Sequence, residues 1–137
     1  MNSVELLLSH DIKPSAQRLA IMDWLTTHPI HPTVDEIWQA LSPDMPTLSK
    51  TTVYNTLRLF VAQGAAQMLT IDERNACFDA DVSPHSHFLC RQCGKVFDVP
   101  FIGTTRLPSA DKLCGHQAEE VQHYYRGICC NCSQQRD

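Results

Sequence analysis

Residues 49–64 read SKTTVYNTLRLFVAQG, and this stretch decides how the first half of the chain folds. Its apolar side chains recur at the three- and four-residue spacing of one helical face: Val53, Leu57, Phe60 and Val61. Gly64 follows, and glycine often ends a helix because it adopts the left-handed conformation without strain. The stretch therefore predicts an amphipathic helix from Ser49 to Gln63.

Two further helices are expected before this one. Pro14 can occupy the first turn of a helix that runs to about Thr27. One face of that helix would carry Ile21, Trp24, Leu25 and His28. Residues 33–36 read TVDE, which has the form of a capping box, and apolar residues follow at helical spacing.

After Gly64 the pattern changes to that of strands. Residues 66–71 and 76–78 are β-prone, and the polar residues 72–75 connect them. Three helices followed by a two-stranded hairpin predict a winged helix-turn-helix over residues 1–80. The helix count alone leaves a small helical domain without a specific function as the alternative.

A second domain is expected over residues 84–137, with the boundary near residues 81–84. Cysteine and histidine are dense in this part, and a weaker helical pattern covers residues 104–113. Its β-prone runs are short: 87–90, 95–99 and 121–128. The chain is therefore predicted to be α+β, with the winged helix followed by a small α/β domain.

Composition restricts the function classes. The 137 residues contain no apolar run of about eighteen residues, so no membrane span is expected. Glu5 lies in an N-terminal stretch without the basic start of a signal peptide, so a cytoplasmic location is expected. The net charge of −4 argues mildly against nucleic acid as a partner. Helix N-termini can still bind phosphate, and a bound dication offsets carboxylate charge.

The seven cysteines point to metal or redox chemistry, because disulfides are rare in a reducing compartment. Four of them form two C-x-x-C units: Cys90, Cys93, Cys129 and Cys132. Two such units can bind one tetrahedral Zn²⁺ at roughly 2.3 Å, which predicts a structural zinc site with four thiolates. A thioredoxin-type redox pair is the alternative, and Cys130 could replace Cys129 by a slip of register. Cys77 and Cys114 are expected to be buried small apolar residues.

Harder metal ligands lie around the first cysteine pair. His85 and His87 are two residues apart, which on a strand directs both imidazoles to the same face. Asp79 precedes them, and Asp98 follows Cys93 by five residues. Each of these residues alone is more often a solvated surface residue, but their combination beside a zinc knuckle favours a second metal site.

Four motifs in order resemble the signatures of the ferric uptake regulator superfamily. They are HPIHPT at residues 28–33, TVYNTL at 52–57, C-x-x-C-G-K at 90–95 and G-I-C-x-x-C at 127–132. The resemblance covers nearly the whole chain. It implies a metal-dependent, DNA-binding transcriptional repressor whose second domain forms a homodimer.

The resemblance also implies a regulatory Fe²⁺ or Mn²⁺ site with five ligands: His31, Asp79, His85, His87 and Asp98. Asp79 and Asp98 favour the peroxide-sensing branch, because iron-responsive members usually carry Glu at these positions. In that branch, bound Fe²⁺ reduces H₂O₂ and a coordinating imidazole, His31 or His85, is oxidised. A repressor of iron or zinc uptake from the same superfamily is the alternative.

The sequence departs from the family pattern at two places. Residues 84–87 read PHSH where iron regulators often carry HHDH, so the additional metal site of those regulators is not expected. Residues 120–124 replace a His-x-Leu-Glu-like stretch, so no metal role is assigned to His116 or His123. His10 and His28 are interpreted as surface or packing residues.

The helix at 49–63 is the expected reader of the DNA major groove, because its solvent face mixes hydroxyl, amide and cationic side chains. Its expected DNA contacts are Ser49, Lys50, Thr51, Thr52, Tyr54, Asn55 and Arg58. Lys13, Gln17 and Arg18 are expected to contact the DNA backbone. Two other classes of function stay open at this point: a zinc hydrolase with a metal-activated water and a zinc-stabilised interaction module.

Overall fold

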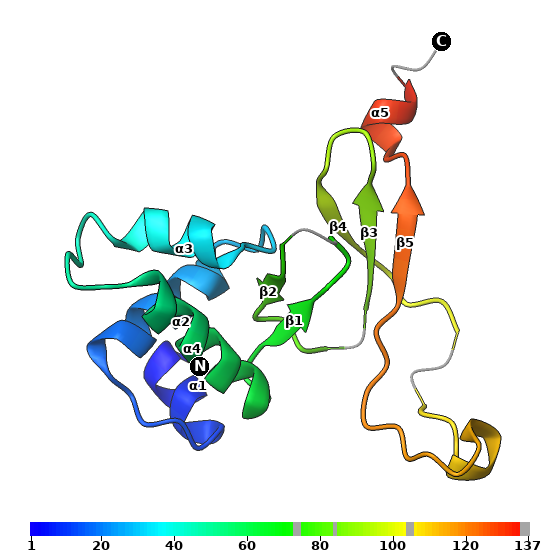
Figure 1. The fold of residues 1–137 in the computed structure, drawn as a ribbon, viewed down its shortest axis with the longest axis horizontal. Coiled ribbons are helices and arrows are strands. Elements are labelled where there is room, and N and C mark those ends of the chain that lie inside the picture. Colours follow the sequence, from blue (N-terminus) through cyan, green and yellow to red (C-terminus); the bar gives the residue numbers. More distant parts are fainter. Residues whose placement is uncertain (73–74, 84, 104–105, 135–137) are drawn as a thin grey trace. The chain divides into compact units, whose positions relative to one another are not determined.

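The computed structural model describes residues 1–72, 75–83, 85–103 and 106–134 (Figure 1). The chain divides into two compact units, Met1–Val82 (unit 1) and Ser83–Asp137 (unit 2). Across the described ranges, no helix has the length and apolarity needed to cross a membrane.

Unit 1 begins with four helices, each capped by a side chain. They are α1 (Ser3–Ser9), α2 (Ala16–Thr27), α3 (Val34–Leu41) and α4 (Lys50–Ala62). The N-caps Asn2, Ser15, Thr33 and Ser49 each accept a hydrogen bond from the backbone N–H three residues ahead. Such caps satisfy N–H groups that have no partner within the helix. The capping box predicted at the start of α3 is confirmed, since Glu36 also bonds back to Thr33.

A two-stranded hairpin follows α4. Strands β1 (Gln67–Leu69) and β2 (Cys77–Asp79) pair antiparallel, with Met68 opposite Phe78. Gly64 has a φ of 78°, so it adopts the left-handed conformation expected at the end of the preceding helix. Helices and hairpin together confirm the winged helix-turn-helix fold.

The core of unit 1 lies between the helices and the hairpin. The largest side chains that are completely or almost completely buried include Leu7, Ile21, Met22, Ile37, Leu57, Phe60 and Phe78. The predicted inner face of the fourth helix is present, because Val53, Leu57 and Phe60 are buried and Val61 is half-buried. The half-buried Trp38 packs against this core, and its indole N–H donates to the Leu48 carbonyl at 2.8 Å.

Two details of the expected helices were wrong. Helix α1 was not expected, because its seven residues offer too short a pattern, yet its Leu7 is completely buried in the core. Pro14 does not lie in the first turn of α2, since Ser15 is the N-cap and the helix begins at Ala16. The Ser15 hydroxyl accepts the Arg18 N–H, so the cap position is taken by the residue after the proline.

Unit 2 contains a three-stranded sheet. Its strands are β3 (Ser86–Cys90), β4 (Val96–Val99) and β5 (Tyr124–Gly127), in the order β4-β3-β5. The central strand β3 pairs antiparallel with β4 and parallel with β5. A short 3₁₀ helix, η1 (Ala110–Leu113), precedes β5, and α5 (Cys130–Gln134) follows it.

Two of the expected elements of unit 2 were too long. A helix was expected over 104–113, but in the described part of that range only η1 is helical; residues 104–105 lie outside the described residues. Pro108 lacks the N–H that an α-helix through this range would need. The strand expected at 121–128 is limited to β5, and α5 was not expected.

Removing a buried leucine should destabilise unit 1. We expect Leu57→Ala to lower its free energy of unfolding by about 2–5 kcal/mol, because Leu57 is completely buried and truncation leaves a cavity. Urea unfolding followed by tryptophan fluorescence measures this, since Trp24 and Trp38, the two tryptophans of the chain, lie in unit 1.

The matched control is Leu8→Ala, whose side chain is 57% exposed. We expect this variant to stay within about 0.5 kcal/mol of the wild type. Equal losses in the two variants would contradict the assignment of Leu57 to the core.

Candidate metal centres and nucleic-acid interface

The four cysteines of the two C-x-x-C units come together in unit 2. The Sγ atoms of Cys90, Cys93, Cys129 and Cys132 all lie within 4.8 Å of one another. Cys90 is completely buried, Cys129 and Cys132 are buried, and Cys93 is exposed. Four sulfurs at these separations match the ligand set of a closed tetrahedral zinc site.

Strand register and a tight turn place these sulfurs. The parallel pairing of β3 with β5 sets Cys90, the last residue of β3, opposite Gly127, the last residue of β5. The first C-x-x-C unit therefore begins at the end of β3, and the second begins just after the end of the neighbouring strand β5. Gly94, with a φ of 78°, donates its N–H to the Cys90 carbonyl at 2.9 Å and closes the turn that carries Cys93. The Arg91 N–H donates to the Gly127 carbonyl at 2.8 Å and continues the pairing beyond the strands.

The electrostatics of the thiol cluster favour a bound cation. The Cys93 N–H donates to the Cys90 sulfur at 3.4 Å and is the main cause that lowers the pKa of Cys90 to about 6. The Cys129 N–H donates to the same sulfur at 3.4 Å and lowers this pKa further. The hydrogen bond with the Cys129 thiol is the main cause that raises the pKa of Cys132 to about 12. The negative charge on one sulfur therefore makes ionisation of the neighbouring thiols less favourable. A bound dication would offset this charge and so favour the thiolate form of all four cysteines.

The remaining cysteines lie outside the thiol cluster. Cys130 is exposed although it adjoins Cys129, so the structure brings Cys129 and not Cys130 to the other three sulfurs. Cys77 is buried as expected, and burial is the main cause that raises its pKa to about 11. Cys114 was expected to be buried but is exposed, because it caps η1 in a left-handed conformation with a φ of 57°.

Unit 1 brings together two of the predicted regulatory ligands. The Nε2 atom of His31 lies 3.5 Å from Oδ2 of Asp79, and both side chains are buried. His31 has a φ of 57°, which non-glycine residues seldom adopt. The next residue, Pro32, accepts the N–H of Phe78 at 2.9 Å, and this bond fixes the His31 loop beside β2, the strand that ends at Asp79. The other carboxylate oxygen of Asp79 accepts the Asp81 N–H at 2.9 Å.

Unit 2 brings together the other three predicted regulatory ligands, His85, His87 and Asp98. Nε2 of His85 and Nε2 of His87 lie 3.2 Å and 3.3 Å from the same atom, Oδ1 of Asp98. The antiparallel register sets His87 directly opposite Asp98. The Nδ1–H of His85 donates to the Ser83 carbonyl at 2.7 Å, which leaves Nε2 of the neutral ring as its electron-pair donor. Two imidazole nitrogens and a carboxylate oxygen thus converge at one place.

Backbone groups form hydrogen bonds with the thiol cluster and with the predicted regulatory ligands, and the sequence analysis did not predict these contacts. The Ser83 carbonyl and the Asp81 N–H orient ligand side chains, while the N–H groups of Cys93 and Cys129 bond a sulfur. Backbone groups are the same in every residue, so only the folded arrangement identifies them.

The histidines that were given no metal role make other contacts. The ring of His28 stacks on Trp24 with centroids 4.2 Å apart. The Nδ1–H of His10 donates to the Gln63 carbonyl at 3.0 Å and joins α1 to the end of α4. His123 lies 2.8 Å from the Ser86 hydroxyl, and His116 is exposed.

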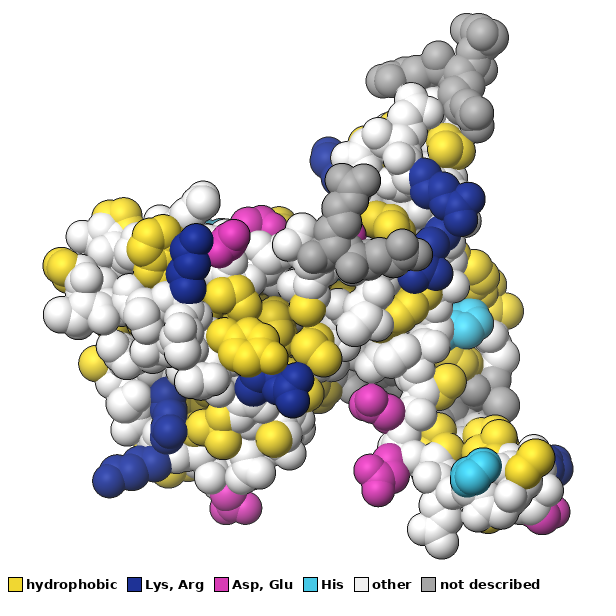
Figure 2. Space-filling model, viewed as in Figure 1, with side chains coloured by type: hydrophobic (Ala, Val, Ile, Leu, Met, Phe, Trp, Pro, Cys, Tyr) yellow, Lys and Arg dark blue, Asp and Glu magenta, His cyan; other side chains and the backbone are white. Residues whose placement is uncertain are grey.

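The predicted DNA-reading residues lie along the start and the outer face of α4. All are exposed except Thr52, which is half-buried: Ser49, Lys50, Thr51, Thr52, Tyr54, Asn55 and Arg58. Ser49 is already engaged as the N-cap and donates its hydroxyl to Thr52 at 2.9 Å. The guanidinium of Arg58 lies 6.0 Å from the ring centre of Tyr54, one helical turn earlier. Figure 2 shows cationic side chains interspersed with uncharged ones over the helices of unit 1, whereas some cationic side chains adjoin one another on unit 2.

The other predicted DNA contacts lie at the start of α2. Lys13, Gln17 and Arg18 line a shallow hollow of about 350 Å³ together with Thr52 of α4. The Arg18 guanidinium donates to the Lys13 carbonyl at 2.8 Å. The residues predicted to contact the DNA backbone therefore share one surface with the start of the predicted reading helix.

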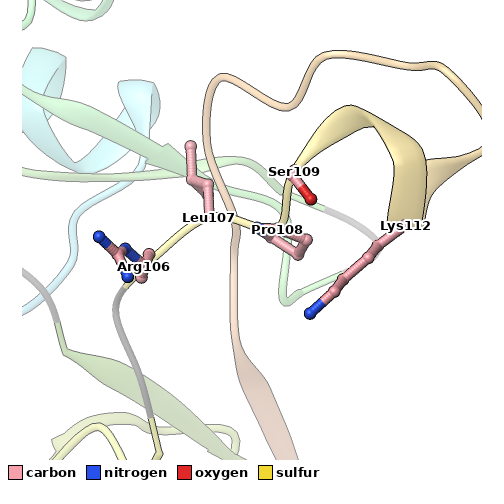
Figure 3. Close-up of a pocket in the computed structure, with 5 residues that line it drawn as sticks. All are labelled: Arg106, Leu107, Pro108, Ser109 and Lys112. Atoms are coloured by element: carbon pink, nitrogen blue, oxygen red, sulfur yellow. The ribbon is translucent and has the colours of Figure 1, made fainter.

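A hollow of about 490 Å³ in unit 2 has a different lining (Figure 3). The side chains of Arg106, Leu107, Pro108, Ser109 and Lys112 surround it. Among these described lining residues, none belongs to a predicted metal or DNA site. We assign the hollow no part in either.

A winged helix in one unit and a four-thiol cluster in the other indicate a zinc-binding transcriptional regulator. The chain belongs to the ferric uptake regulator family, whose sequence model matches residues 9–123. The peroxide-responsive repressor PerR of Staphylococcus aureus (strain Mu50) is 37% identical over 134 residues, which cover 95% of this chain and 88% of that protein. The family consists of transcriptional regulators, so the chain is not an enzyme and the hydrolase alternative is excluded.

Solved structures of the family share the fold. The ferric uptake regulator of Helicobacter pylori is 18% identical with a TM-score of 0.69, covering 96% of this chain and 89% of that one. PerR of Streptococcus pyogenes is 24% identical with a TM-score of 0.54, covering 96% and 94%. The Helicobacter pylori regulator has three functional metal-binding sites, and the Streptococcus pyogenes protein senses peroxide and regulates genes.

Replacing one cysteine of the thiol cluster should remove zinc. We expect Cys93→Ser to lower the zinc content from about one ion per chain towards zero and to speed hydrogen exchange in β3, because a closed site needs four ligands. Cys130→Ser is the matched control, since Cys130 is exposed and outside the cluster. Elemental analysis and exchange mass spectrometry measure both effects. Unchanged zinc and exchange in Cys93→Ser would overturn the assignment.

Zinc retention should also depend on pH. Hydrogen bonds lower the pKa of Cys90 to about 6, so its thiolate form persists down to that pH and is lost below it. Because protons and metal compete for the same sulfurs, we expect the zinc affinity, measured by competition with a chelator of known proton affinity, to fall more steeply below about pH 6, where Cys90 also binds a proton.

Proposed function

We propose that the chain is a metal-dependent, DNA-binding repressor that senses peroxide through a regulatory Fe²⁺ or Mn²⁺ ion. The observation that carries the proposal is the division of the predicted ligands between the two units. Unit 1 supplies one imidazole and one carboxylate, and unit 2 supplies two imidazoles and one carboxylate. Neither unit alone supplies the five predicted ligands.

A metal bound by both groups of ligands would fix the angle between the units. His31 and Asp79 would bind it from the DNA-binding unit, and His85, His87 and Asp98 from the other unit. A ligand that binds one arrangement better than others shifts the population towards that arrangement. Metal occupancy and DNA affinity are therefore coupled, and the coupling is reciprocal.

The donor types support the choice of metals. Imidazole nitrogen and carboxylate oxygen suit Fe²⁺ and Mn²⁺, while the four thiolates suit zinc. Zn²⁺ would bind the nitrogen and oxygen ligands more tightly than Fe²⁺ or Mn²⁺ do, so metal availability has to exclude it from the regulatory site. The zinc of the thiol cluster would be structural, and the other ion would be regulatory.

We propose that the protein acts in the cytoplasm as a homodimer on double-stranded operator DNA. A symmetric dimer sets two reading helices at a fixed spacing, which matches two half-sites about 34 Å apart or a multiple of that distance. The exposed face of α4 would read base edges, and the surface of Lys13, Gln17 and Arg18 would hold the phosphate backbone.

Peroxide sensing is supported by Asp79 and Asp98 and by the similarity to PerR. When bound, Fe²⁺ supplies the electrons that reduce H₂O₂ to a species able to oxidise a neighbouring imidazole. His31 and His85 would be the targets within this chain. An oxidised His31 would no longer join the DNA-binding unit to the metal, so repression would end.

Two substitutions on α4 test DNA reading. We expect Tyr54→Ala and Arg58→Ala to weaken operator binding about tenfold or more, since a base-edge contact contributes about 1–3 kcal/mol. Fluorescence anisotropy with labelled operator DNA measures the affinity, and elemental analysis checks that both metals remain bound. Wild-type affinity in both variants would mean that another surface reads the DNA.

A peroxide challenge tests the sensing mechanism. After Fe²⁺ loading and a low dose of H₂O₂, we expect a gain of about 16 Da, one oxygen atom, on His31 or His85. The tryptic peptide 75–91 contains His85 and no methionine, but it also contains His87, Cys77 and Cys90, so fragment ions have to assign the oxygen to His85. Peptide 19–50 also contains Met22 and Met45, so fragment ions have to assign the oxygen to His31.

The Mn²⁺-loaded protein is the control, because Mn²⁺ is a poor reductant of peroxide. Release from DNA should follow the histidine modification in the Fe²⁺ form and be absent in the Mn²⁺ form. Unmodified histidines together with DNA release through disulfides would indicate thiol sensing. Absence of both modification and release would leave a repressor of iron or zinc uptake that responds to metal alone.

A further inference from the structure

Lys50, the first residue of α4, is held by two side chains of α3. Its Nζ atom lies 3.1 Å from Oδ1 of Asp35 and 5.0 Å from the ring centre of Trp38. Asp35 and Trp38 are three residues apart, so both project from the same face of α3. The carboxylate and the face of the indole ring both attract the ammonium group.

The indole ring is a fixed support for this contact. Its N–H donates to the Leu48 carbonyl, two residues before Lys50, and the ring packs against the core of unit 1. The ammonium and the carboxylate are more exposed, with 53% and 63% of their side-chain surfaces accessible. The ion pair can therefore open without disturbing the core.

Asp35 also lies on the side of unit 1 that carries the predicted reading helix. Asp35 and Tyr54 of α4 line one hollow of about 250 Å³, together with Thr33, Val34, Asn75, Ala76 and Phe78. A negative charge at this place works against binding a polyanion, and the chain already carries a net charge of −4.

We propose that Asp35 is an affinity-setting residue that holds Lys50 away from DNA phosphates and so weakens DNA binding by α4. The inference rests on the proposed DNA-binding function. A phosphate that approaches Lys50 has to compete with Asp35 for the ammonium. The weakening is independent of base sequence, because phosphates carry no sequence information.

Asp35→Asn tests the proposal, because the substitution removes the charge and preserves the shape. We expect this variant to bind operator and random DNA several-fold more tightly at about 50 mM salt, by a similar factor on both. One added phosphate contact steepens the salt dependence by about 0.9, so the gain should shrink about threefold to fourfold on going to about 200 mM salt. Asp44→Asn, an equal charge change on an exposed residue in the turn after α3, should give a smaller gain.

A double-mutant cycle separates the capture of Lys50 from direct repulsion of DNA. We expect Lys50→Gln to weaken binding more in the Asp35→Asn protein than in the wild type, because only the freed ammonium contacts phosphate fully. If Asp35→Asn gives the same gain with Gln at position 50, Asp35 acts by direct repulsion and the proposal is overturned. Unchanged or weaker DNA binding in Asp35→Asn overturns it as well.

A measurement without DNA distinguishes failure of this inference from failure of the proposed function. An amine-reactive ester should modify Lys50 faster in Asp35→Asn than in the wild type, because the amine is no longer held against α3 by the carboxylate 3.1 Å away. Peptide mass spectrometry follows the rate, with Lys95 in unit 2 as internal reference. Equal rates at Lys50 overturn the inference even if the protein binds DNA. If Lys50 is modified faster in Asp35→Asn while no variant binds DNA with Fe²⁺, Mn²⁺ or Zn²⁺, that result overturns the proposed function and the DNA-related part of the inference.

Discussion

Four sulfur atoms within 4.8 Å of one another are the constraint on which unit 2 depends. The buried residues of this cluster are Cys90, Cys129 and Cys132, with Phe88, Phe97 and Ile128 packed against them. Among the described residues this core is small, and small domains of some 55 residues are often stabilised by metals or disulfides. Zinc bound to the cluster would supply that stability. It would fix β3 and, through the strand register, the position of His87 opposite Asp98.

Unit 1 positions its two ligands by a different means. Its apolar core is extensive, and the hydrogen bond from Phe78 to the Pro32 carbonyl connects this core to the loop of His31. Phe78 is completely buried, so the bond is protected from water. The left-handed backbone of His31 costs on the order of 1 kcal/mol, and the core offsets that cost. The histidine is therefore held beside Asp79 by residues with no metal-binding role.

The sequence predicted what depends on periodicity and spacing. The α4 helix, the Thr33 capping box and the glycine at the end of α4 were all expected, because each has a local signal. It did not predict α1, whose seven residues are helical mainly because Leu7 enters the core, nor the exposure of Cys114. For the candidate sites, it supplied the ligand types but not the convergence of His85 and His87 on one oxygen of Asp98. That convergence depends on strand pairing and on the Ser83 carbonyl, neither of which has a sequence signature.

The two groups of nitrogen and oxygen ligands differ in exposure, and this difference bears on the order of metal binding. In unit 2 the carboxylate of Asp98 is 47% exposed, whereas in unit 1 both His31 and Asp79 are buried. In the proposed function, a metal ion from solvent would first meet the exposed carboxylate of Asp98, beside the less exposed His85 and His87. Binding to the buried His31 and Asp79 would come second, because burial requires the ion to lose part of its hydration. In the proposed function, the second step is the one that restricts the angle between the units. The affinity of the first group would then set how much metal the protein senses, and the second group would convert occupancy into a change in DNA affinity.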